Sequence, residues 1–509
     1  MSLLLDRFLA QPGHHCAIVD LDGTAWSFDE VLSCAVYLAH RLHVSGVAGR
    51  VVLVAADPGP LFSVADLAVQ LAGAVPAVVP ELTQRQLAEL WPILDPAAVI
   101  ETTGSPGLLA EAAARTATEL HQITGHRPTR VANVASRAVA REFAAARWEP
   151  VAALIFTSGT TATPRPLAIE ERALVRGVDA WTGTWPARPT RTVSYLPVSH
   201  IAQRIMGHTL MCLYGATVIT TTPDRLAEDI PAHRPDTLLA VPRIWTRLAA
   251  AAARDDGPGR GLRGALASVR TAVNGAAALD PALAGELRRL TGMTIAGAYG
   301  ASETSVPAFH QPDAARPGLG APVGVEYRIG ADGELLLRGE HLAAGYVERW
   351  PQLRALTDPD GWWHTGDLAR RDADGQVCLA GRLAAAFKTS RGEMIAPEPV
   401  EAHLAAHPQV LAACLVGHGL AAAIALVCAP ETATWPRDRV AELEHALYER
   451  ARTARHLGEL PFSDLAAVRV TDDPWPELGL VTNTGKVRRR EIAARYPHLL
   501  APEDIHAGA

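Results

Sequence analysis

The sequence lacks three features that would assign it to common classes of protein. It has no basic excess, because 47 lysines and arginines stand against 54 aspartates and glutamates, for a net charge of -7. Nucleic-acid-binding proteins usually carry the opposite imbalance, so we expect no nucleic-acid partner. The sequence also has no uninterrupted apolar run long enough to cross a bilayer, and no basic segment precedes the leucines of residues 1–10. We therefore expect neither a membrane span nor a signal peptide.

Cysteine is scarce as well. The six cysteines are scattered along the chain, at Cys16, Cys34, Cys212, Cys378, Cys414 and Cys428. None of them pairs at the short spacing of a metal site, and their pattern does not suggest a disulfide framework. We therefore expect the protein to work in the reducing cytoplasm.

What the sequence does have is length and apolar residues. A chain of 509 residues is too long for one hydrophobic core, so two or more domains are expected. Its hydrophobic fraction of 49% and charged fraction of 20% are those of a globular protein.

The first part of the chain reads as alternating strands and helices. Short apolar runs such as Val51–Ala55 and Ala74–Val79 alternate with helical patterns. This alternation predicts βα units around largely parallel sheets. After a less readable region at 104–147 the alternation resumes, with expected strands at Val151–Phe156, Thr192–Leu196, Ala216–Thr221, Thr237–Val241 and Val269–Val273 and helix-like stretches at Ile201–Leu213 and Arg243–Ala253.

The pattern changes near Gly318. Asp-Gly pairs at 332–333, 360–361 and 374–375 predict tight turns between short antiparallel strands, which together form a small β-barrel-like part. Beyond it, expected helices at Pro399–Ala406 and Asp438–Arg455 enclose two apolar strands, Val410–Val416 and Ala421–Cys428.

These patterns predict an α/β fold in two domains. The large N-terminal domain would cover residues 1–381 and contain the βα-type sheets and the β-barrel-like part. A small, mobile α+β domain would cover residues 382–509, with a hinge near Ala384.

A run of hydroxyl side chains follows the strand expected at 151–156. The run from Thr157 to Thr161 places four hydroxyls around Gly159, without an acidic residue. Hydroxyls and free backbone N–H groups are what a polyphosphate requires. A surface turn rich in Thr and Ser is an equally good interpretation of this run alone.

A second motif, at 297–304, combines a ring, a hydroxyl and a carboxylate. The face of Tyr299 can stack on a base, Ser302 can bind a phosphate oxygen, and Glu303 can bind Mg²⁺. The structural alternative is a strand end followed by a helix cap.

Further candidates lie in the last third of the chain. Asp367 follows a glycine and could accept both hydroxyls of a ribose, although a hairpin with a solvated aspartate would give the same pattern. Arg382 follows another glycine, and Lys388 precedes Thr389-Ser390. Lys486 stands beside Gly485, where a mobile cation could be carried.

In this order and spacing the motifs resemble the ANL superfamily of adenylate-forming enzymes, over essentially the whole chain. The segment 194–201, and the segment 388–390 together with 395–401, are most similar to long-chain acyl-CoA synthetases. In such enzymes a carboxylate attacks the α-phosphate of Mg-ATP and pyrophosphate leaves. The small domain then rotates, and a thiol attacks the acyl-adenylate. The resemblance therefore implies an acid–thiol ligase that uses ATP or acyl-AMP, Mg²⁺ and coenzyme A.

The resemblance also implies a role for individual residues. Those that would bind the nucleotide or coenzyme A are Thr157, Ser158, Gly159, Thr160, Thr161, Asn274, Gly275, Ala276, Ala298, Tyr299, Gly300, Ser302, Asp367, Arg382, Lys388 and Gly392. Among them, 157–161 would wrap the β- and γ-phosphates, Tyr299 and 274–276 would flank adenine, and Ser302 would touch the α-phosphate. Asp367 and Arg382 would hold the ribose.

Three residues would act in catalysis. Lys486 would bridge the attacking carboxylate and the α-phosphate, where a cation stabilises developing charge and aligns the reactants. Glu303 would ligate Mg²⁺, and His200 would lie at the acyl pocket, at the gate between acid and thiol.

The sequence departs from the family at the phosphate loop. The usual Thr-Gly-x-Pro-Lys-Gly reads Thr161-Ala162-Thr163-Pro164-Arg165-Pro166 here. Two glycines that permit close approach to phosphate are lost, Pro166 removes a backbone N–H, and Arg165 replaces a compact ammonium. All three changes weaken a cradle for pyrophosphate, whereas the positions expected to hold AMP are intact. One hypothesis is therefore a protein that uses a supplied acyl-adenylate, made by a companion adenylating enzyme. The other is an ordinary ligase with a slower first step.

Further departures leave the thiol acceptor open. The expected pivot is Leu383-Ala384 rather than a charged residue, and Arg391 replaces a glycine near the thiol tunnel of the family. Loading of a carrier protein, or ligand binding without catalysis, are the alternatives to an acyl-CoA ligase. Ile201–Leu213 contains no acidic residue to hold an ammonium, which favours an acid without an amine.

Overall fold

The computed structural model describes residues 2–102, 107–123, 133–146, 150–157, 163–255, 261–391, 394–418, 420–456, 465–481 and 487–500. The chain packs as two compact units. Unit 1 consists of Met1–Tyr327 and Leu337–Trp363, and unit 2 of Arg328–Leu336 and His364–Ala509. Residues from His364 up to the predicted boundary at 381 therefore pack with unit 2. The hinge near Ala384 stays a prediction.

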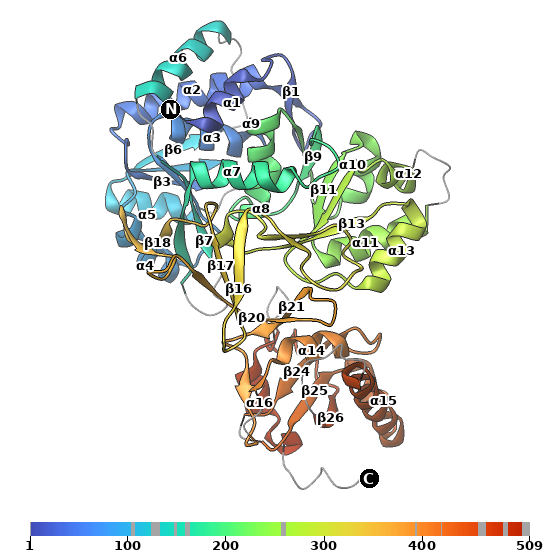
Figure 1. The fold of residues 1–509 in the computed structure, drawn as a ribbon. Coiled ribbons are helices and arrows are strands. Elements are labelled where there is room, and N and C mark those ends of the chain that lie inside the picture. The colour runs from blue at the N-terminus through green and yellow to red at the C-terminus, as the bar shows by residue number, and fades with distance from the viewer. Residues whose placement is uncertain are drawn as a thin grey trace. The chain divides into compact units, whose positions relative to one another are not determined.

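Two large sheets form unit 1 (Figure 1). The eight-stranded sheet has the order β19-β18-β8-β7-β4-β3-β5-β6. Its strands β3 to β7 pair in parallel, and the edge with β8, β18 and β19 is antiparallel. In chain order these strands are β3 Val51–Ala55, β4 Val75–Val78, β5 Ala98–Thr102, β6 Glu119–Ile123, β7 Val151–Thr157, β8 Arg165–Glu170, β18 Gly345–Arg349 and β19 Gln352–Ala355.

The second sheet has nine strands, in the order β15-β14-β13-β12-β11-β9-β10-β1-β2. The pairs from β13 through β10 to β1 are parallel. In chain order the strands are β1 Cys16–Val19, β2 Ala25–Ser27, β9 Arg191–Ser194, β10 Thr217–Thr220, β11 Thr237–Ala240, β12 Thr271–Asn274, β13 Ile295–Tyr299, β14 Phe309–Gln311 and β15 Ala321–Pro322. The apolar runs expected as parallel strands are confirmed, because strands covered on both faces must be apolar throughout.

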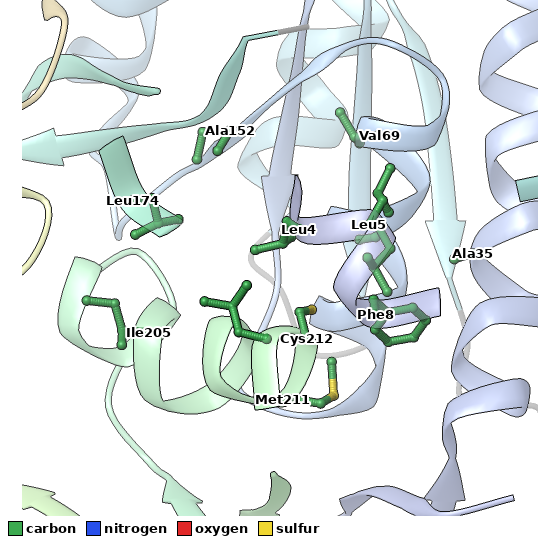
Figure 2. Packing of buried hydrophobic residues seen from close by; sticks show 14 of the residues in the cluster. Leu4, Leu5, Phe8, Ala35, Val69, Ala152, Leu174, Ile205, Met211 and Cys212 are labelled. Atoms are coloured by element: carbon green, nitrogen blue, oxygen red, sulfur yellow. The ribbon is translucent and has the colours of Figure 1, made fainter. Parts of the chain in front are cut away.

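Helices cover both faces of each sheet. The helices of unit 1 are α1 Leu3–Ala10, α2 Phe28–Val44, α3 Pro60–Leu71, α4 Gln84–Leu94, α5 Leu108–Thr116, α6 Asn133–Ala146, α7 Glu171–Thr182, α8 Ile201–Arg204, α9 Leu210–Tyr214, α10 Leu226–His233, α11 Pro242–Ala253, α12 Leu262–Ala267 and α13 Pro281–Thr291. Helices α10 to α13 cover the nine-stranded sheet on one side, and α4 and α5 cover the outer face of the other sheet. The central core lies between the two sheets, where α1 and α9 pack together through side chains such as Leu4, Phe8 and Met211 (Figure 2).

One expected helix is interrupted. The helix predicted at Ile201–Leu213 exists, but a π-helical turn, η1 Ile205–Thr209, separates α8 from α9. Such turns widen a helix by one residue and are frequent at functional sites. Periodicity alone could not predict the interruption, since it shifts the helix by a single residue.

Unit 2 is the expected small α+β part. Its sheet has the order β24-β25-β26, and its core lies between that sheet and helices α14 and α15. The elements are β20 Trp363–Arg371, β21 Val377–Arg382, β22 Phe387–Lys388, β23 Met394–Ile395, α14 Pro397–Ala405, β24 Ala412–Val416, β25 Ala423–Cys428, α15 Arg437–His456, β26 Leu465–Thr471 and α16 Arg489–Arg495. The boundary between the units passes through β16 Val325–Ile329, β17 Glu334–Gly339 and β20, which with β21 form a four-stranded sheet. Among the described residues, no helix is long and apolar enough to cross a membrane.

Candidate nucleotide and acyl site

Several predicted site residues lie where parallel strands end. Asn274 is the last residue of β12, and Tyr299 is the last residue of β13. These two strands are parallel neighbours with Asn274 opposite Gly297, so Tyr299 follows two residues later on the adjacent strand. Ligands of open α/β sheets bind beyond the carboxyl ends of the strands. The structure thus brings the two segments predicted to flank adenine to one sheet edge.

Asn274 has an unused acceptor there. Its side chain is buried, with 3% exposed, and its Nδ2 donates to the carbonyl oxygen of Ala277 at 2.7 Å. No described residue gives its Oδ1 a hydrogen-bond partner. A buried acceptor without a partner costs free energy, and the exocyclic amino group of adenine is a donor that would satisfy it. Ala276 has a φ of +69°, a conformation unusual for a residue with a Cβ. The local structure therefore fits an adenine base.

The turn after β13 holds Ser302 and Glu303 on a short 3-10 helix, η2 Ser302–Thr304. At Gly300 an added Cβ would lie 2.9 Å from Thr304 Oγ1 and 3.0 Å from Pro307 Cα, so a larger residue would displace the turn. Thr304 Oγ1 accepts from Ala301 N at 3.1 Å and donates to Val306 O at 2.6 Å. The turn is therefore fixed from inside, and Ser302 and Glu303 remain partly accessible.

Glu303 is contacted from the segment that leads into β18. Its backbone oxygen accepts from Ala343 N at 2.8 Å, and its carboxylate accepts a hydrogen bond from the hydroxyl of Tyr346. Partial burial and the neighbouring carboxylate both raise the pKa of Tyr346, so the phenol stays protonated and donates. The guanidinium of Arg165 lies over the ring of Tyr346, 4.1 Å from its centroid.

The donor set suits magnesium. Among the described residues, no three His, Cys, Asp or Glu side chains gather as a metal site. Glu303 offers one carboxylate, which lies beside the hydroxyl of Tyr346. Mg²⁺ in nucleotide enzymes is bound by one or two carboxylates together with substrate phosphates. Glu303 would hold the ion, and the ion would neutralise charge on the phosphates when bound.

Most of the phosphate loop lies outside the described residues. The positions left out are Ser158, Gly159, Thr160, Thr161 and Ala162. The described ends of the loop form an antiparallel pair in which Thr157 stands opposite Arg165, and Phe156 stands opposite Pro166. The predicted loop therefore begins and ends on adjacent strands of the eight-stranded sheet. Its role in phosphate binding stays a prediction.

His200 precedes α8 at the end of a loop that is tightly held. The amide of Gln203 accepts from Tyr195 N at 3.3 Å and from Leu196 N at 2.9 Å, and it donates to Ser194 Oγ at 2.5 Å. The imidazole of His200 keeps solvent access, yet partial desolvation by the surrounding protein lowers its pKa. His200 is therefore a neutral imidazole near pH 7, and its place in an acyl pocket stays a prediction.

The helix behind His200 is anchored by a buried ion pair. Arg204 donates to both carboxylate oxygens of Asp66 on α3, at 2.6 and 2.8 Å, and both side chains are at most 1% exposed. His208, in the π-helical turn, lies 3.1 Å from the same carboxylate. Burial raises the pKa of Asp66, but Arg204 and His208 outweigh it and lower this pKa to about 2. Asp66 is thus a paired structural carboxylate and not a partner for a substrate amine.

In unit 2, the two predicted ribose residues contact each other. The hairpin register places Asp367 opposite Arg382, and Arg382 Nε lies 2.8 Å from Asp367 Oδ1. The side chain of Asp367 is only 13% exposed, so the alternative of a solvated hairpin aspartate is wrong. Gly366, with φ +71°, and Gly381, with φ +126°, precede the two residues in a conformation that favours glycine. Carboxylate and guanidinium are thus held side by side, and their role in ribose binding stays a prediction.

The remaining candidates are described only in part. Lys388 is exposed on β22, and Ala384 lies in a turn in which the N–H groups of Ala385 and Ala386 donate to Arg382 O, at 3.1 and 3.0 Å. Gly392 and Lys486 lie outside the described residues. Val481 and Val487, the described residues on either side of the segment that contains Lys486, form an antiparallel bridge.

A family model described as AMP-binding enzyme matches residues 5–347, more than half of the chain. The chain belongs to the AMP-binding enzyme family. This assignment confirms the resemblance to the adenylate-forming ANL enzymes, and it covers Glu303, Tyr299 and Asn274 in one matched region. Relatives with curated names agree: a long-chain-fatty-acid–CoA ligase, FadD15, of Mycobacterium tuberculosis is 28% identical over 86% of this chain and 84% of its own length.

Two further relatives differ in what their names say. A sulfoacetate–CoA ligase of Cupriavidus necator is 32% identical over 52% of this chain and 54% of its own length. An isonitrile lipopeptide synthase of Streptomyces coeruleorubidus is 30% identical over 99% of this chain, which spans 34% of that relative.

Solved structures share the fold. The ATP-bound MatB of Rhodopseudomonas palustris is 20% identical, with a TM-score of 0.76 over 98% of this chain and 100% of its own. MenE of Bacillus subtilis, with the acyl-adenylate OSB-AMP, is 18% identical, with a TM-score of 0.73 over 96% and 97%. The predicted α/β architecture of AMP-binding enzymes is therefore confirmed.

Sequence reasoning missed three contributors to this site. Tyr346 lies 43 residues from Glu303 along the chain, and Gln203 and Arg204 act through side chains that local patterns do not pair. A signal was present in the last case, because an arginine inside an otherwise apolar helix needs a buried partner.

Proposed function

We propose that this chain is an acyl-CoA ligase that joins a carboxylic acid to coenzyme A through an acyl-adenylate. The observation that carries the proposal is the sheet edge at which Asn274, with its unpartnered buried oxygen, meets Tyr299 and the turn with Glu303. A base acceptor, an aromatic ring and a metal-binding carboxylate within one family-matched region fit a nucleotide better than any other common ligand.

The reaction has two steps. An oxygen of the acid forms a bond to the α-phosphorus of ATP while the bond to pyrophosphate breaks. Lys486 stabilises the charge that builds between the two reactants, as the resemblance implies. The thiolate sulfur of coenzyme A then bonds to the acyl carbon, and AMP leaves with the electron pair of the broken C–O bond.

The first step of this scheme is the weaker part. Arg165 and Pro166 stand at the described end of a loop from which the usual glycines are missing, whereas every AMP-binding position of the family is present. We propose that adenylation is slow and that the chain converts a supplied acyl-adenylate efficiently. A companion adenylating enzyme would then be its partner.

The acid is proposed to be apolar and without an amine. The segment from Ile201 to Leu213 has no acidic side chain, and Asp66, the aspartate that contacts this segment from α3, is already paired with Arg204. Two relatives named long-chain-fatty-acid–CoA ligase support a fatty acid as the substrate class.

A carrier protein is the second candidate acceptor. The relative named isonitrile lipopeptide synthase aligns with 99% of this chain, and the chain corresponds to a third of it. Arg391, in place of a glycine expected near the thiol tunnel, would meet the pantetheine arm of either acceptor and does not distinguish them.

Mass spectrometry of products tests these proposals together. A panel of fatty acids is incubated with ATP and coenzyme A, and in parallel presynthesised acyl-AMP is incubated with coenzyme A or with a phosphopantetheinylated carrier protein. The proposal predicts acyl-CoA from acyl-AMP at a rate well above that from free acid and ATP. Acylation of the carrier alone would favour the second candidate, and no thioester from either source would refute ligase activity.

A further inference from the structure

Tyr346 lies in the candidate site, but neither the sequence motifs nor the family resemblance gives it a role. It is half-buried on β18, between β8 and β19 of the eight-stranded sheet. Its register partners are Leu167 on β8 and Arg354 on β19. From there its hydroxyl reaches Glu303, which belongs to a turn at the edge of the other sheet. One side chain thus joins the two large sheets at the predicted magnesium ligand.

The segment that carries Tyr346 holds the Glu303 turn at three points. His341 Nδ1 lies 2.8 Å from Thr304 O, and its Nε2 lies 2.7 Å from Val323 O. Ala343 N donates to Glu303 O at 2.8 Å. Tyr346 adds the only one of these contacts that reaches the carboxylate. The backbone of the turn is therefore fixed without Tyr346, and the phenol governs where the carboxylate points.

Arg165 acts on this phenol. Residues 165 and 167 share one face of β8, because alternate residues of a strand point the same way, and Leu167 is the register partner of Tyr346. The guanidinium of Arg165 consequently lies 4.1 Å from the ring centroid, and that of Arg354 lies 5.5 Å away. A cation over an aromatic face is attracted by the ring and draws electron density from it, which strengthens the phenol as a donor.

We propose that Tyr346, stacked under Arg165, is the positioning residue for the Glu303 carboxylate, and that this pair couples the phosphate-loop strand to the magnesium site. This inference rests on the proposed function only in assigning Mg²⁺ to Glu303. A phenol occupies one carboxylate oxygen without cancelling its charge, so the carboxylate is oriented and still attracts a cation. Partners of this kind typically change metal affinity about 10–100-fold when removed.

The contact with the ring gives the arginine at position 165 a role that lysine would fill less well. A planar guanidinium lies flat on a ring, whereas an ammonium is a compact and strongly hydrated point charge. Arg165 is therefore more than a weakened phosphate ligand. Replacing it with the lysine usual in the family would release the ring and loosen the carboxylate.

Metal binding tests the proposal without relying on turnover. Mn²⁺ replaces Mg²⁺, and its affinity for the full chain in the presence of α,β-methylene-ATP is measured by electron paramagnetic resonance. Tyr346→Phe is expected to weaken Mn²⁺ about tenfold, and Arg165→Lys about threefold in the same direction. The double variant should lose no more than Tyr346→Phe alone, because the arginine acts through the phenol.

Two matched variants serve as controls: one removes a tyrosine hydroxyl that donates to a carboxylate, and the other removes an arginine that lies over a ring, both elsewhere in unit 1. The hydroxyl of Tyr214 donates to Asp179 at 2.6 Å, and the guanidinium of Arg338 lies 4.6 Å from the Trp362 ring. Tyr214→Phe and Arg338→Lys should leave Mn²⁺ affinity unchanged.

A second readout separates positioning from general damage. Thioester formation from supplied acyl-AMP has no departing pyrophosphate to neutralise, so Tyr346→Phe should change it less than twofold while raising the Mg²⁺ concentration needed for ATP–pyrophosphate exchange about tenfold. Unchanged Mn²⁺ affinity in Tyr346→Phe would overturn the proposal, as would equal losses in both half-reactions. A wild-type chain that forms no thioester would refute the proposed function alone, since Mn²⁺ affinity is measured without it.

Discussion

Glu303 and Asp367 are both predicted to meet the nucleotide, yet their neighbours differ in charge. The carboxylate of Glu303 accepts from a neutral phenol, whereas Asp367 lies against the guanidinium of Arg382 at 2.8 Å. Glu303 belongs to unit 1 and Asp367 to unit 2. Both carboxylates are oriented, but only the second is neutralised by its partner.

The difference separates two kinds of recognition. A carboxylate held by a phenol keeps its full negative charge, which a divalent cation requires. A carboxylate paired with an arginine offers acceptors and donors without net charge, which suits the neutral hydroxyls of a ribose. The local partner of each carboxylate therefore suits the ligand that is predicted for it, and substitutions can separate the two.

The largest expected effect comes from Lys486, which only the first of the two steps should need. Lys486→Ala should lower ATP–pyrophosphate exchange by about 10²–10³-fold and leave thioester formation from acyl-AMP mostly intact, since the predicted domain rotation would remove the lysine from the second conformation. Lys486→Arg is the matched control for charge. The chain has only two lysines, Lys388 and Lys486, among 47 basic residues, so arginine replaces lysine almost everywhere else. Equal loss of both half-reactions would contradict the rotation.

Asp367 should affect both half-reactions, in contrast to Lys486 and Tyr346. Asp367→Ala removes the predicted ribose acceptor and the carboxylate partner of Arg382, so adenylate binding should weaken by about 1.5–3 kcal/mol. Calorimetry with a non-hydrolysable acyl-AMP mimic measures the loss. Asp374→Ala, an exposed aspartate in the turn of the same hairpin, should leave affinity unchanged. An unaltered affinity in Asp367→Ala would assign that residue a structural role.

The smallest expected effect separates two features of the altered phosphate loop, namely the missing glycines and the arginine at position 165. Ala162→Gly with Pro166→Gly should increase ATP–pyrophosphate exchange, because backbone freedom and an N–H return to the loop. Adding Arg165→Lys restores the family pattern but removes the stack on Tyr346, so the triple variant should fall about threefold below the double one. A triple variant that exceeds the double variant would show that the ammonium matters more than the stack. Robust exchange by the unmodified protein would refute slow adenylation itself.

The sequence predicted the parts of the fold that depend on local pattern. Val51–Ala55 is apolar throughout, Thr237–Ala240 is apolar after its first residue, and short runs of this kind between helical patterns favour buried parallel strands. Asp367 and Arg382 were both identified, but not as neighbours, because only the register of β20 and β21 brings them together. Tyr346 and Gln203 escaped prediction for the same reason: each acts through side-chain contacts that no periodicity records. Lys486 and most of the phosphate loop lie outside the described residues, so their roles stay predictions.

The buried pair of Arg204 and Asp66 gives the protein a built-in limit toward acid. The pKa of Asp66 is lowered to about 2 in the folded chain, below its ordinary value of 3.8, so the pair stabilises the fold fully above pH 4 and loses its contribution as the pH falls toward 2. Protonation leaves the arginine with its charge and no counterion inside the core. The helix that begins after His200 would therefore lose its anchor to α3, and loss of structure in acid would start beside the residue that is predicted to line the acyl pocket.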